Sequence, residues 1–249
     1  MSHAAGMSIV GRRENNEDAF RIREDLGLYL VADGMGGHAG GEIASRLAAN
    51  TIVKAFENAH DSTRPTGDTA QIMRVRMATA VQLAVDAVEQ QAVGDLEEMG
   101  TTLAAVLVEG NLALIAHVGD SRVYRLRRGR LECLTKDHSF ANECRDELRP
   151  SVLPEHFASM ITRCIAADSV TMPDLRIETT EPGDVFMICS DGITDVLGNE
   201  EMGDLIDDHE VALEAAEALV AAAYDAESYD NITCVIVHAA PRAANVSAA

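Results

Sequence analysis

Short apolar runs and helical spacings of apolar residues divide the first part of the chain into a predicted strand and two predicted helices. The run LYLVA at 28–32 contains β-favouring Tyr and Val and is followed by Asp33-Gly34, so it predicts a buried strand. Apolar or small side chains recur at i, i+3 and i+4 over 41–59 and again over 73–88, which predicts two helices. The polar stretch between these helices is predicted to be a loop.

The second part of the chain changes to β character and then returns to helix. Short apolar runs separated by turn residues over 101–133 predict an antiparallel meander, and 185–189 and 232–237 predict two more strands. The region 199–224 is mainly helical, whereas 138–175 has three prolines and no sustained period and is predicted to be an irregular excursion with room for a short helix. Strands in hairpin-like groups and helices in pairs favour an α+β fold with antiparallel sheets.

Composition limits the class of protein. At 249 residues the chain fits one domain, and an apolar fraction of 47% with 4% aromatics and no Trp requires a core of Ala, Val, Leu, Ile and Met. No apolar run approaches the roughly 20 residues that span a bilayer, and the start lacks a signal-peptide pattern. Five cysteines without a CxxC spacing argue against a disulfide framework or a thiolate zinc site. We therefore expect a soluble, cytoplasmic protein without membrane contact.

The charge balance points to cations rather than polyanions as ligands. A formal net charge of -21 repels nucleic acid and anionic lipid, so binding to either is not expected. Divalent cations would be attracted instead. The acidity could equally serve only to keep the protein soluble, and composition does not separate these two interpretations.

Acidic residues recur at the ends of the predicted strands. Asp33, Asp120 and Asp191 follow apolar runs, and Asp230 directly precedes one. Each residue alone is more often a turn former than a ligand. Together with the Glu17-Asp18 pair, however, these strand ends could converge at one edge of a sandwich. A carboxylate cluster there would repel itself unless hard cations were bound within it.

Seven segments carry a more specific pattern. In order, they are GRRENNED at 11–18, VADGMGGHAGG at 31–41, GTT at 100–102, HVGDSRVYR at 117–125, LTKDHS at 134–139, ICSDGITD at 188–195 and DNITCVIV at 230–237. In these segments the sequence resembles the type 2C, or PPM, family of metal-dependent Ser/Thr phosphatases, particularly its short bacterial single-domain members. The ordered matches extend over nearly the whole chain.

The resemblance implies a fold and an activity. The expected fold is a four-layer α-β-β-α sandwich of two antiparallel sheets flanked by helix pairs, in a single domain at 1–240 with a flap at about 139–172 and a flexible tail at 241–249. The expected reaction is hydrolysis of phosphoserine and phosphothreonine through a metal-activated water at a centre of two or three Mn²⁺ or Mg²⁺ ions. Paired cations suit this chemistry because they lower the pKa of water and stabilise charge on the phosphoryl group.

The resemblance also implies roles for the acidic residues. Asp33 would bridge two cations, with the Gly34 carbonyl and Glu17 completing the ligands of one cation and Asp191 and Asp230 those of the other. Such all-oxygen ligands favour Mg²⁺ or Mn²⁺ over softer metals.

Four further residues receive roles from the same resemblance. Asp18 would act mostly through metal-bound water, and Asp120 together with Asp191 would hold a third, weaker metal. Arg13 would bind the substrate phosphate through its planar fork of donors, although a solvated surface charge is the simpler interpretation without the family pattern. His38 is the candidate general acid, but three residues separate it from Asp33-Gly34 where animal relatives have none, so a loop histidine without a catalytic role is an equal alternative.

Other residues in these segments are expected to be structural. His117 lies within an apolar run and His138 follows Asp137 in a loop. Ser121 is expected in a turn, and Arg122 in a buried ion pair.

Two other functions stay open alongside the phosphoprotein phosphatase. The chain could be a catalytically weak relative that binds phosphoproteins as a regulatory module, or an enzyme that acts on a small phosphoester. Degenerate relatives lose metal carboxylates, whereas all six are present here, which favours activity. The expected partners are phosphorylated proteins of bacterial signalling, a cognate Ser/Thr kinase and its substrates among them, and the expected state is a monomer.

Overall fold

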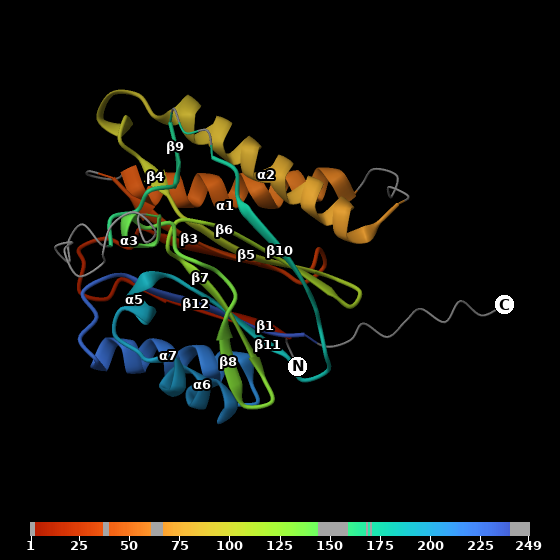
Figure 1. Ribbon diagram of the computed structural model, residues 1–249. Helices are drawn as coiled ribbons and strands as arrows, with labels where there is room; N and C mark the ends of the chain where they lie inside the picture. The colour runs from red at the N-terminus through yellow and green to blue at the C-terminus, as the bar shows by residue number, and fades with distance from the viewer. Residues whose placement is uncertain are drawn as a thin grey trace.

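Two antiparallel sheets lie face to face, and helices cover the outer face of each (Figure 1). The computed structural model describes residues 3–36, 40–60, 67–143, 159–167, 169 and 171–239. The five-stranded sheet has the order β1 (Ala4–Ile9), β12 (Ile232–His238), β11 (Val185–Cys189), β7 (Arg122–Arg127) and β8 (Arg130–Cys133). The second sheet has the order β10 (Asp174–Thr179), β6 (Leu112–Val118), β5 (Leu103–Glu109), β3 (Leu28–Met35), β4 (Gly100–Thr101) and β9 (Ile165–Ala166), with β2 (Asp18–Arg23) also paired to β3.

The helices form the two outer layers. α1 (Gly40–His60) and α2 (Thr69–Gln91) cover the second sheet, and α6 (Asn199–Asp207) and α7 (Ala212–Asp225) cover the five-stranded sheet (Figure 1). Short elements complete the fold: η1 (Gly94–Leu96), α3 (Phe140–Glu143) and α5 (Asp191–Thr194). The predicted four-layer α-β-β-α sandwich is therefore confirmed.

The apolar core consists of three layers that fill the spaces between helices and sheets. On β3, Leu28 and Leu30 pack under α1 and α2, whereas Tyr29 and Val31 pack between the two sheets. β12 shows the same alternation towards α7 and towards the other sheet. Because both faces of these central strands are buried, each reads in the sequence as a continuous apolar run. That is why the central strands were predictable.

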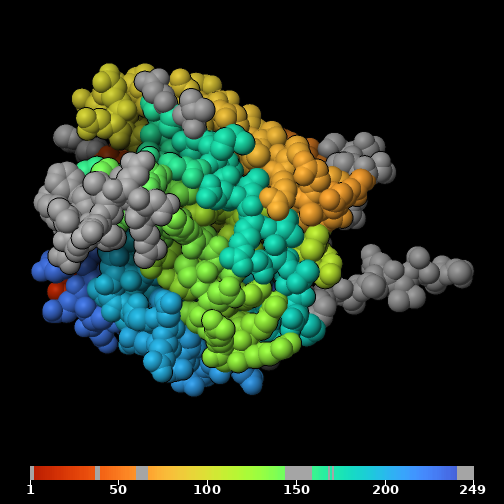
Figure 2. Space-filling view, viewed as in Figure 1, coloured from red at the N-terminus to blue at the C-terminus, as the bar shows by residue number. Residues whose placement is uncertain are grey.

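The predicted helices and the central strands are confirmed, and the helical region 199–224 divides into α6 and α7. Four strands were not predicted: β1, β2, β9 and β10. β1, β9 and β10 each lie at an edge of their sheet, and β2 pairs with β3 alone. Their side chains are mostly half-buried, and Figure 2 shows the segment around β10 at the molecular surface. A strand covered on one side carries a weak hydrophobic signal.

The prediction of one antiparallel meander over 101–133 is wrong. β5 pairs with β6 and β7 pairs with β8, but β6 and β7 belong to different sheets. The chain crosses between the sheets at Gly119, whose φ of +98° is left-handed and whose Cβ, if present, would lie 2.7 Å from the Thr102 side chain. This crossing places Asp120 at the end of the sandwich where the other acidic residues gather.

Half of the predicted flap lies outside the described residues. Within 139–172 the structure describes α3, β9 and a bridge between Ser139 and Ile161, and the predicted tail at 241–249 is also outside the described part of the chain. Among the helices that the structure describes, none is both long and apolar enough to cross a membrane.

Candidate metal centre

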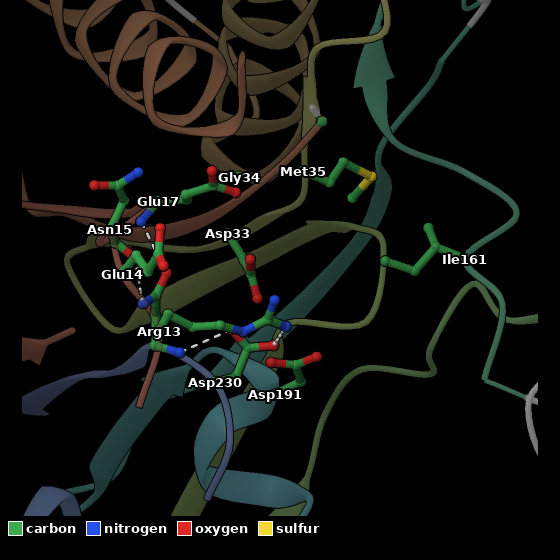
Figure 3. A pocket seen from close by; sticks show the side chains of 12 residues that line it. Arg13, Glu14, Asn15, Glu17, Asp33, Gly34, Met35, Ile161, Asp191 and Asp230 are labelled. Atoms are coloured by element: carbon green, nitrogen blue, oxygen red, sulfur yellow. Dashed lines mark hydrogen bonds and ion pairs between the residues drawn. The ribbon is translucent and has the colours of Figure 1, made fainter. Parts of the chain in front are cut away.

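A cavity of about 540 Å³ lies at the end of the sandwich where the two sheets meet (Figure 3). It is lined by six of the nine residues proposed from the sequence: Arg13, Glu17, Asp33, Gly34, Asp191 and Asp230. They come from the β1–β2 connection, the end of β3, the start of α5 and the residue pair before β12. Figure 3 shows the side chains of Asp33, Asp191 and Asp230 pointing into the same space. Residues up to 217 positions apart in sequence therefore meet at one site.

The main chain of Asp33 is held by two threonines of the GTT segment. The Asp33 N–H donates to Thr102 Oγ1 at 3.0 Å, and Thr101 Oγ1 donates to the Asp33 carbonyl at 2.9 Å. These bonds anchor the backbone and leave the carboxylate directed to the cavity. Neither threonine was given a role from the sequence, although both lie in a segment that carries the resemblance.

Two glycines allow Glu17 to approach β3. The Gly34 N–H donates to the Glu17 carbonyl at 3.2 Å, and a Cβ on Gly34 would lie 2.1 Å from the Gly41 carbonyl oxygen. A Cβ on Gly41 would lie 2.4 Å from Glu17 Oε2. Because such distances exclude any side chain, these glycines are required for close approach and not only for a turn.

Asn231 holds the loop that carries Glu17. Its Nδ2 donates to the carbonyls of Val10 and Asn15, both at 2.9 Å, and its Oδ1 accepts from the Glu17 N–H at 2.8 Å. One amide side chain thus fixes three points of the β1–β2 connection. This role was missed, and the only sequence signal for it is the position of Asn231 in the DNIT segment.

Asp18 lies behind the cavity and directly opposite Asp33. The register of β2 and β3 pairs these two residues, which brings like charges together. Asp18 is 6% exposed, and Ser190 Oγ donates to its Oδ2 at 2.8 Å. Ser190 was not predicted to take part in the site.

Three carboxylate oxygens in this region are buried without a hydrogen-bond partner among the described residues. They are Oδ1 of Asp18, Asp120 and Asp191. A buried, unpaired carboxylate oxygen is costly, and a bound cation is one way to satisfy it. These oxygens and the all-oxygen donor set fit hard divalent cations.

Burial and mutual repulsion raise the pKa values of these carboxyl groups. Burial and then the neighbouring Asp18, Asp191 and Asp120 raise the pKa of Asp33 well above its usual range. Burial and then Asp120 and Asp230 raise the pKa of Asp191 to about 8. Burial likewise raises the pKa values of Asp18 and Asp120 to about 6. The cluster therefore resists ionisation by itself and is suited to accept compensating positive charge.

Arg13 lies at the cavity and pairs with an acidic residue. Its Nη2 donates to Asp230 Oδ2 at 2.7 Å, while Asp230 Oδ1 accepts from the Asn231 N–H at 2.8 Å. The hydrogen bond to Asp230 is the largest cause of a raised pKa at Arg13. The side chain is 59% exposed, so the guanidinium combines an ion pair with access to the cavity. Its role as a phosphate ligand stays a prediction.

His38, the candidate general acid, lies outside the described residues. Asp120 belongs to the electrostatic cluster, since it raises the pKa values of Asp33 and Asp191, but it does not line the cavity.

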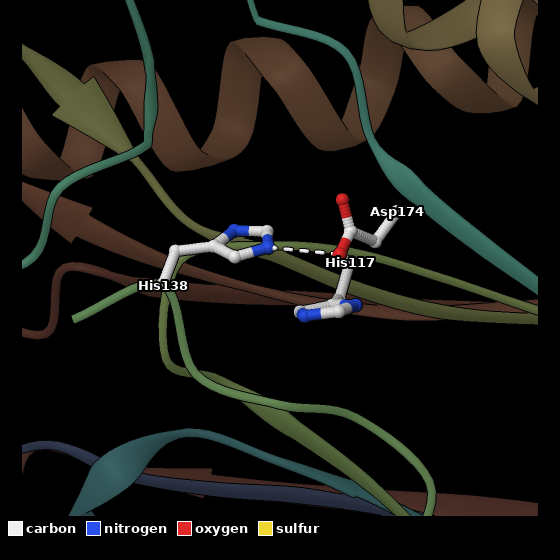
Figure 4. Close-up of side chains that lie close together, drawn as sticks. All are labelled: His117, His138 and Asp174. Atoms are coloured by element: carbon white, nitrogen blue, oxygen red, sulfur yellow. Dashed lines mark ion pairs between the residues drawn. The ribbon is translucent and has the colours of Figure 1, made fainter. Parts of the chain in front are cut away.

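A second group of metal-ligand types, His117, His138 and Asp174, lies elsewhere, with ligand atoms within 4.8 Å of one another (Figure 4). The two rings stack at 4.5 Å. Gly119 N–H donates to His138 Nδ1 at 3.1 Å, which places the proton of neutral His138 on Nε2, 3.3 Å from Asp174. Arg163 Nη1 lies 2.8 Å from that Nε2 and 2.9 Å from Asp174. With a guanidinium beside the ligand atoms, the group is a structural network, as predicted for both histidines.

The predicted ion pair of Arg122 is confirmed. Arg122 makes a bidentate pair with Asp137 at 2.9 and 2.7 Å. Ser121 lies in the connection between β6 and β7, buried, with its Oγ 2.7 Å from Thr102 Oγ1.

Comparison with known proteins identifies relatives over most of the chain. A sequence profile described as Protein phosphatase 2C matches residues 5–225. The serine/threonine protein phosphatase PstP of Mycobacterium tuberculosis is 36% identical over 229 residues, which are 90% of this chain and 42% of PstP. The serine/threonine phosphatase stp of Listeria welshimeri is 30% identical over 251 residues, which are 94% of this chain and 95% of that protein.

A solved structure shares the fold. The catalytic domain of PstP in complex with two manganese ions has a TM-score of 0.79 and 35% identity, over 94% of this chain and 96% of that one. The chain thus spans less than half the length of PstP and nearly all of the Listeria protein.

Proposed function

Because the chain belongs to the protein phosphatase 2C family, we propose that it is a metal-dependent phosphatase that removes phosphate from phosphoserine and phosphothreonine in proteins. The observation that carries the proposal is the convergence of Glu17, Asp33, Asp191 and Asp230 on one cavity beside Arg13. Buried carboxylate oxygens at this site have no hydrogen-bond partner among the described residues, which favours a cation site. The two manganese ions of the PstP catalytic domain support Mn²⁺, with Mg²⁺ as the alternative hard cation.

The proposed ligand roles follow the sequence prediction. Asp33 would be shared by two cations, with Glu17 and the Gly34 carbonyl on one side and Asp191 and Asp230 on the other. When bound, the cations supply a water of lowered pKa and offset the charge of the phosphoryl group.

Two more carboxylates stand behind these ligands. Asp18, hydrogen-bonded to Ser190, would act from behind the residues that contact the cations, and Asp120 would join Asp191 at a third, weaker position.

Arg13 would bind the phosphate of the substrate. Its guanidinium offers five donors in a plane, and the bond to Asp230 engages Nη2. Asp230 would then both hold a cation and orient Arg13. His38 is proposed as the general acid that protonates the leaving alkoxide.

The wider setting of the activity is also proposed. The substrates would be cytoplasmic phosphoproteins, together with the Ser/Thr kinase that modifies them, and the enzyme would act as a monomer. Residues 1–240 would form the single catalytic domain, with the flap at 139–172 next to the site.

The test is release of phosphate from phosphothreonine peptides, an aryl phosphate and small phosphoesters, measured side by side with Mn²⁺, Mg²⁺ or excess chelator. Asp33→Asn and Asp191→Asn should each reduce turnover at least about 100-fold, because the preceding proposals require both carboxylates for the cations. Asp204→Asn, an exposed residue on α6, is the matched control and should leave turnover unchanged.

Each outcome has a distinct meaning. Peptide hydrolysis that requires metal supports the proposal, and full activity in chelator contradicts it. Hydrolysis of small esters alone would instead favour a small-molecule phosphatase. Phosphopeptide binding without turnover would favour a regulatory module.

A further inference from the structure

Half of the tyrosines of this aromatic-poor chain lie exposed beside the cavity. The sequence contains four tyrosines and no Trp. Tyr29 and Tyr124 are buried in the core, whereas Tyr224 is 45% exposed and Tyr229 is 78% exposed. Aromatic residues are enriched where proteins bind partners, because a ring offers a large apolar contact area.

Arg12 organises both exposed rings. Its guanidinium carbon lies 5.8 Å from the centre of the Tyr224 ring and 6.0 Å from that of Tyr229, within the range of cation–π contacts. Arg12 also forms an ion pair with Glu227 at 3.5 Å. These contacts hold the end of α7 and the following turn against the β1–β2 connection, so the rings are arranged before any partner arrives.

This surface continues directly into the proposed catalytic cavity. Arg12 precedes Arg13 and Tyr229 precedes Asp230, and the Arg13–Asp230 pair closes the gap between the two segments at 2.7 Å. Figure 1 shows the red β1–β2 connection beside the blue segment between α7 and β12. Val10, 41% exposed, lies two residues before Arg12 on the same connection. We name the surface of Val10, Arg12, Tyr224 and Tyr229 the aromatic rim.

We propose that the aromatic rim binds the substrate polypeptide next to its phosphoresidue, and that it selects segments with an apolar or aromatic side chain there. This inference rests on the proposed phosphatase function. A small phosphoester would occupy the cavity without reaching the rim, whereas a phosphoprotein segment must continue past the cavity edge. The rim lies on one such path, because it borders the two residues proposed to hold the phosphate and a cation.

The charges around the rim favour apolar over acidic neighbours. Glu227 already pairs with Arg12, which reduces the positive charge available to an acidic side chain. The chain as a whole carries a formal net charge of -21, which repels acidic segments. The parts of the Tyr224 and Tyr229 rings that Arg12 does not cover remain as the principal contact area, and aromatic rings pack best against apolar or aromatic groups.

The test compares phosphothreonine peptides that carry Phe or Ala at each of the two positions on either side of the phosphoresidue, with an aryl phosphate as the small substrate. With the wild-type chain and Mn²⁺, at least one Phe position should raise kcat/KM about fivefold over Ala, mainly through KM, which corresponds to roughly 1 kcal/mol. Tyr229→Ala should remove this preference and leave the rate on the aryl phosphate unchanged. Tyr229→Phe should retain the preference, because it keeps the ring.

Val75→Ala is the matched control, since Val75 is 54% exposed on α2, away from the rim. It should change neither the preference nor the aryl phosphate rate. Absence of any preference in the wild-type chain overturns the inference without needing a folded variant. A preference that survives Tyr229→Ala overturns it as well, as does a change in oligomeric state in that variant, which would make the rim a contact between copies. Failure of the proposed function looks different, because the wild-type chain would then hydrolyse none of the phosphothreonine peptides, whatever residue flanks the phosphoresidue.

Discussion

At the scale of single residues, the side chain of Arg13 combines two roles, an ion pair with Asp230 and the proposed contact with the substrate phosphate. It donates to Asp230 through Nη2, and its 59% exposure leaves the rest of the guanidinium accessible from the cavity. A planar group with five donors can serve a carboxylate and a phosphate together, which a lysine ammonium cannot do with the same geometry. The ion pair with Asp230 therefore determines both the orientation of the Arg13 guanidinium plane and the charge around it.

Arg13→Ala is expected to raise KM for phosphothreonine peptides about tenfold, with a smaller effect on kcat, because it removes phosphate binding more than water activation. Steady-state kinetics at saturating Mn²⁺ measure both constants. Arg13→Lys keeps the charge but not the fork and should recover only part of the loss. An unchanged KM in Arg13→Ala would contradict the phosphate-binding role.

The sequence predicted the acidic residues that line the cavity but not the residues that hold them in place. Acidic groups at strand ends have a chemistry that is visible in the sequence, so Asp33, Asp191 and Asp230 could be proposed as ligands from their positions in the chain. The role of Asn231 consists of hydrogen bonds to main-chain groups 214 to 221 positions away. Such a role depends on the fold, and an isolated Asn has no periodicity or spacing that reveals it.

At the scale of elements, the site depends on how connections cross the end of the sandwich. The central strands could be predicted because both of their faces are buried. The edge strands β1, β2, β9 and β10 could not, and neither could the passage of the chain from β6 in one sheet to β7 in the other. Local patterning shows that a strand exists, but it does not show which sheet the strand joins. The chain crosses between the sheets where the sequence predicted a hairpin, and this crossing brings Asp120 to the cluster.

Asn231 is the clearest link between elements, because it joins the start of β12 to the β1–β2 connection. Asn231→Ala removes three hydrogen bonds at about 1 kcal/mol each, so we expect a loss of roughly 2–3 kcal/mol in unfolding free energy. Urea denaturation in the presence of a chelator measures this change in unfolding free energy. Asn199→Ala, at the exposed start of α6, is the control and should change stability little.

The same variant should also bind Mn²⁺ more weakly, because Glu17 loses the bond that fixes its main chain. Isothermal titration calorimetry measures this affinity. A variant with reduced stability and unchanged Mn²⁺ affinity would limit Asn231 to a structural role.

A third element-level contact links the flap and β10 to the crossing. Asp174 lies 3.3 Å from His138 Nε2 and pairs with Arg163, while His138 Nδ1 accepts from the Gly119 N–H, next to Asp120. His138→Ala should lower the melting temperature by about 3 °C or more, equivalent to roughly 1 kcal/mol, because a buried N–H loses its acceptor. Differential scanning calorimetry measures the shift, with His3→Ala, an exposed residue just before β1, as the control. A shift no larger than that of the control would contradict a structural role for His138.

At the scale of the whole molecule, the acidic cluster opposes folding in the absence of cations. Five aspartates gather where two sheets meet, in a chain that already carries a formal net charge of -21. Cations that bind the folded state relieve this repulsion and shift the folding equilibrium by mass action. Stability and the proposed catalysis would therefore depend on the same carboxylates, so the metal-free protein reports on the site without any substrate.

The pH dependence of metal-free stability tests this coupling. Burial and neighbouring charges raise the pKa of Asp191 to about 8 from an ordinary value of 3.8, so the folded state holds a proton that the unfolded state releases. Stability from this group is thus present at low pH and is lost as pH rises towards 8. In Asp191→Asn the side chain stays neutral at every pH. In chelator, we expect the melting temperature of the variant to exceed that of the wild type by a margin that grows from pH 5 to pH 8.5 and reaches about 3 °C or more at pH 8.5.

Histidines do not disturb this comparison, because their contributions are shared by both proteins. Millimolar Mn²⁺ should reverse the order at pH 8.5, since it stabilises the wild-type chain and the variant lacks a ligand. Scanning fluorimetry over this pH range measures the melting temperatures of wild type and variant, each with chelator and with Mn²⁺. A difference between variant and wild type that does not grow with pH would mean that Asp191 ionises freely, and that the acidic cluster does not need a cation to fold. The reversal by Mn²⁺ ties the same residue to metal binding, because protonation and a divalent ion are alternative ways to neutralise one carboxylate.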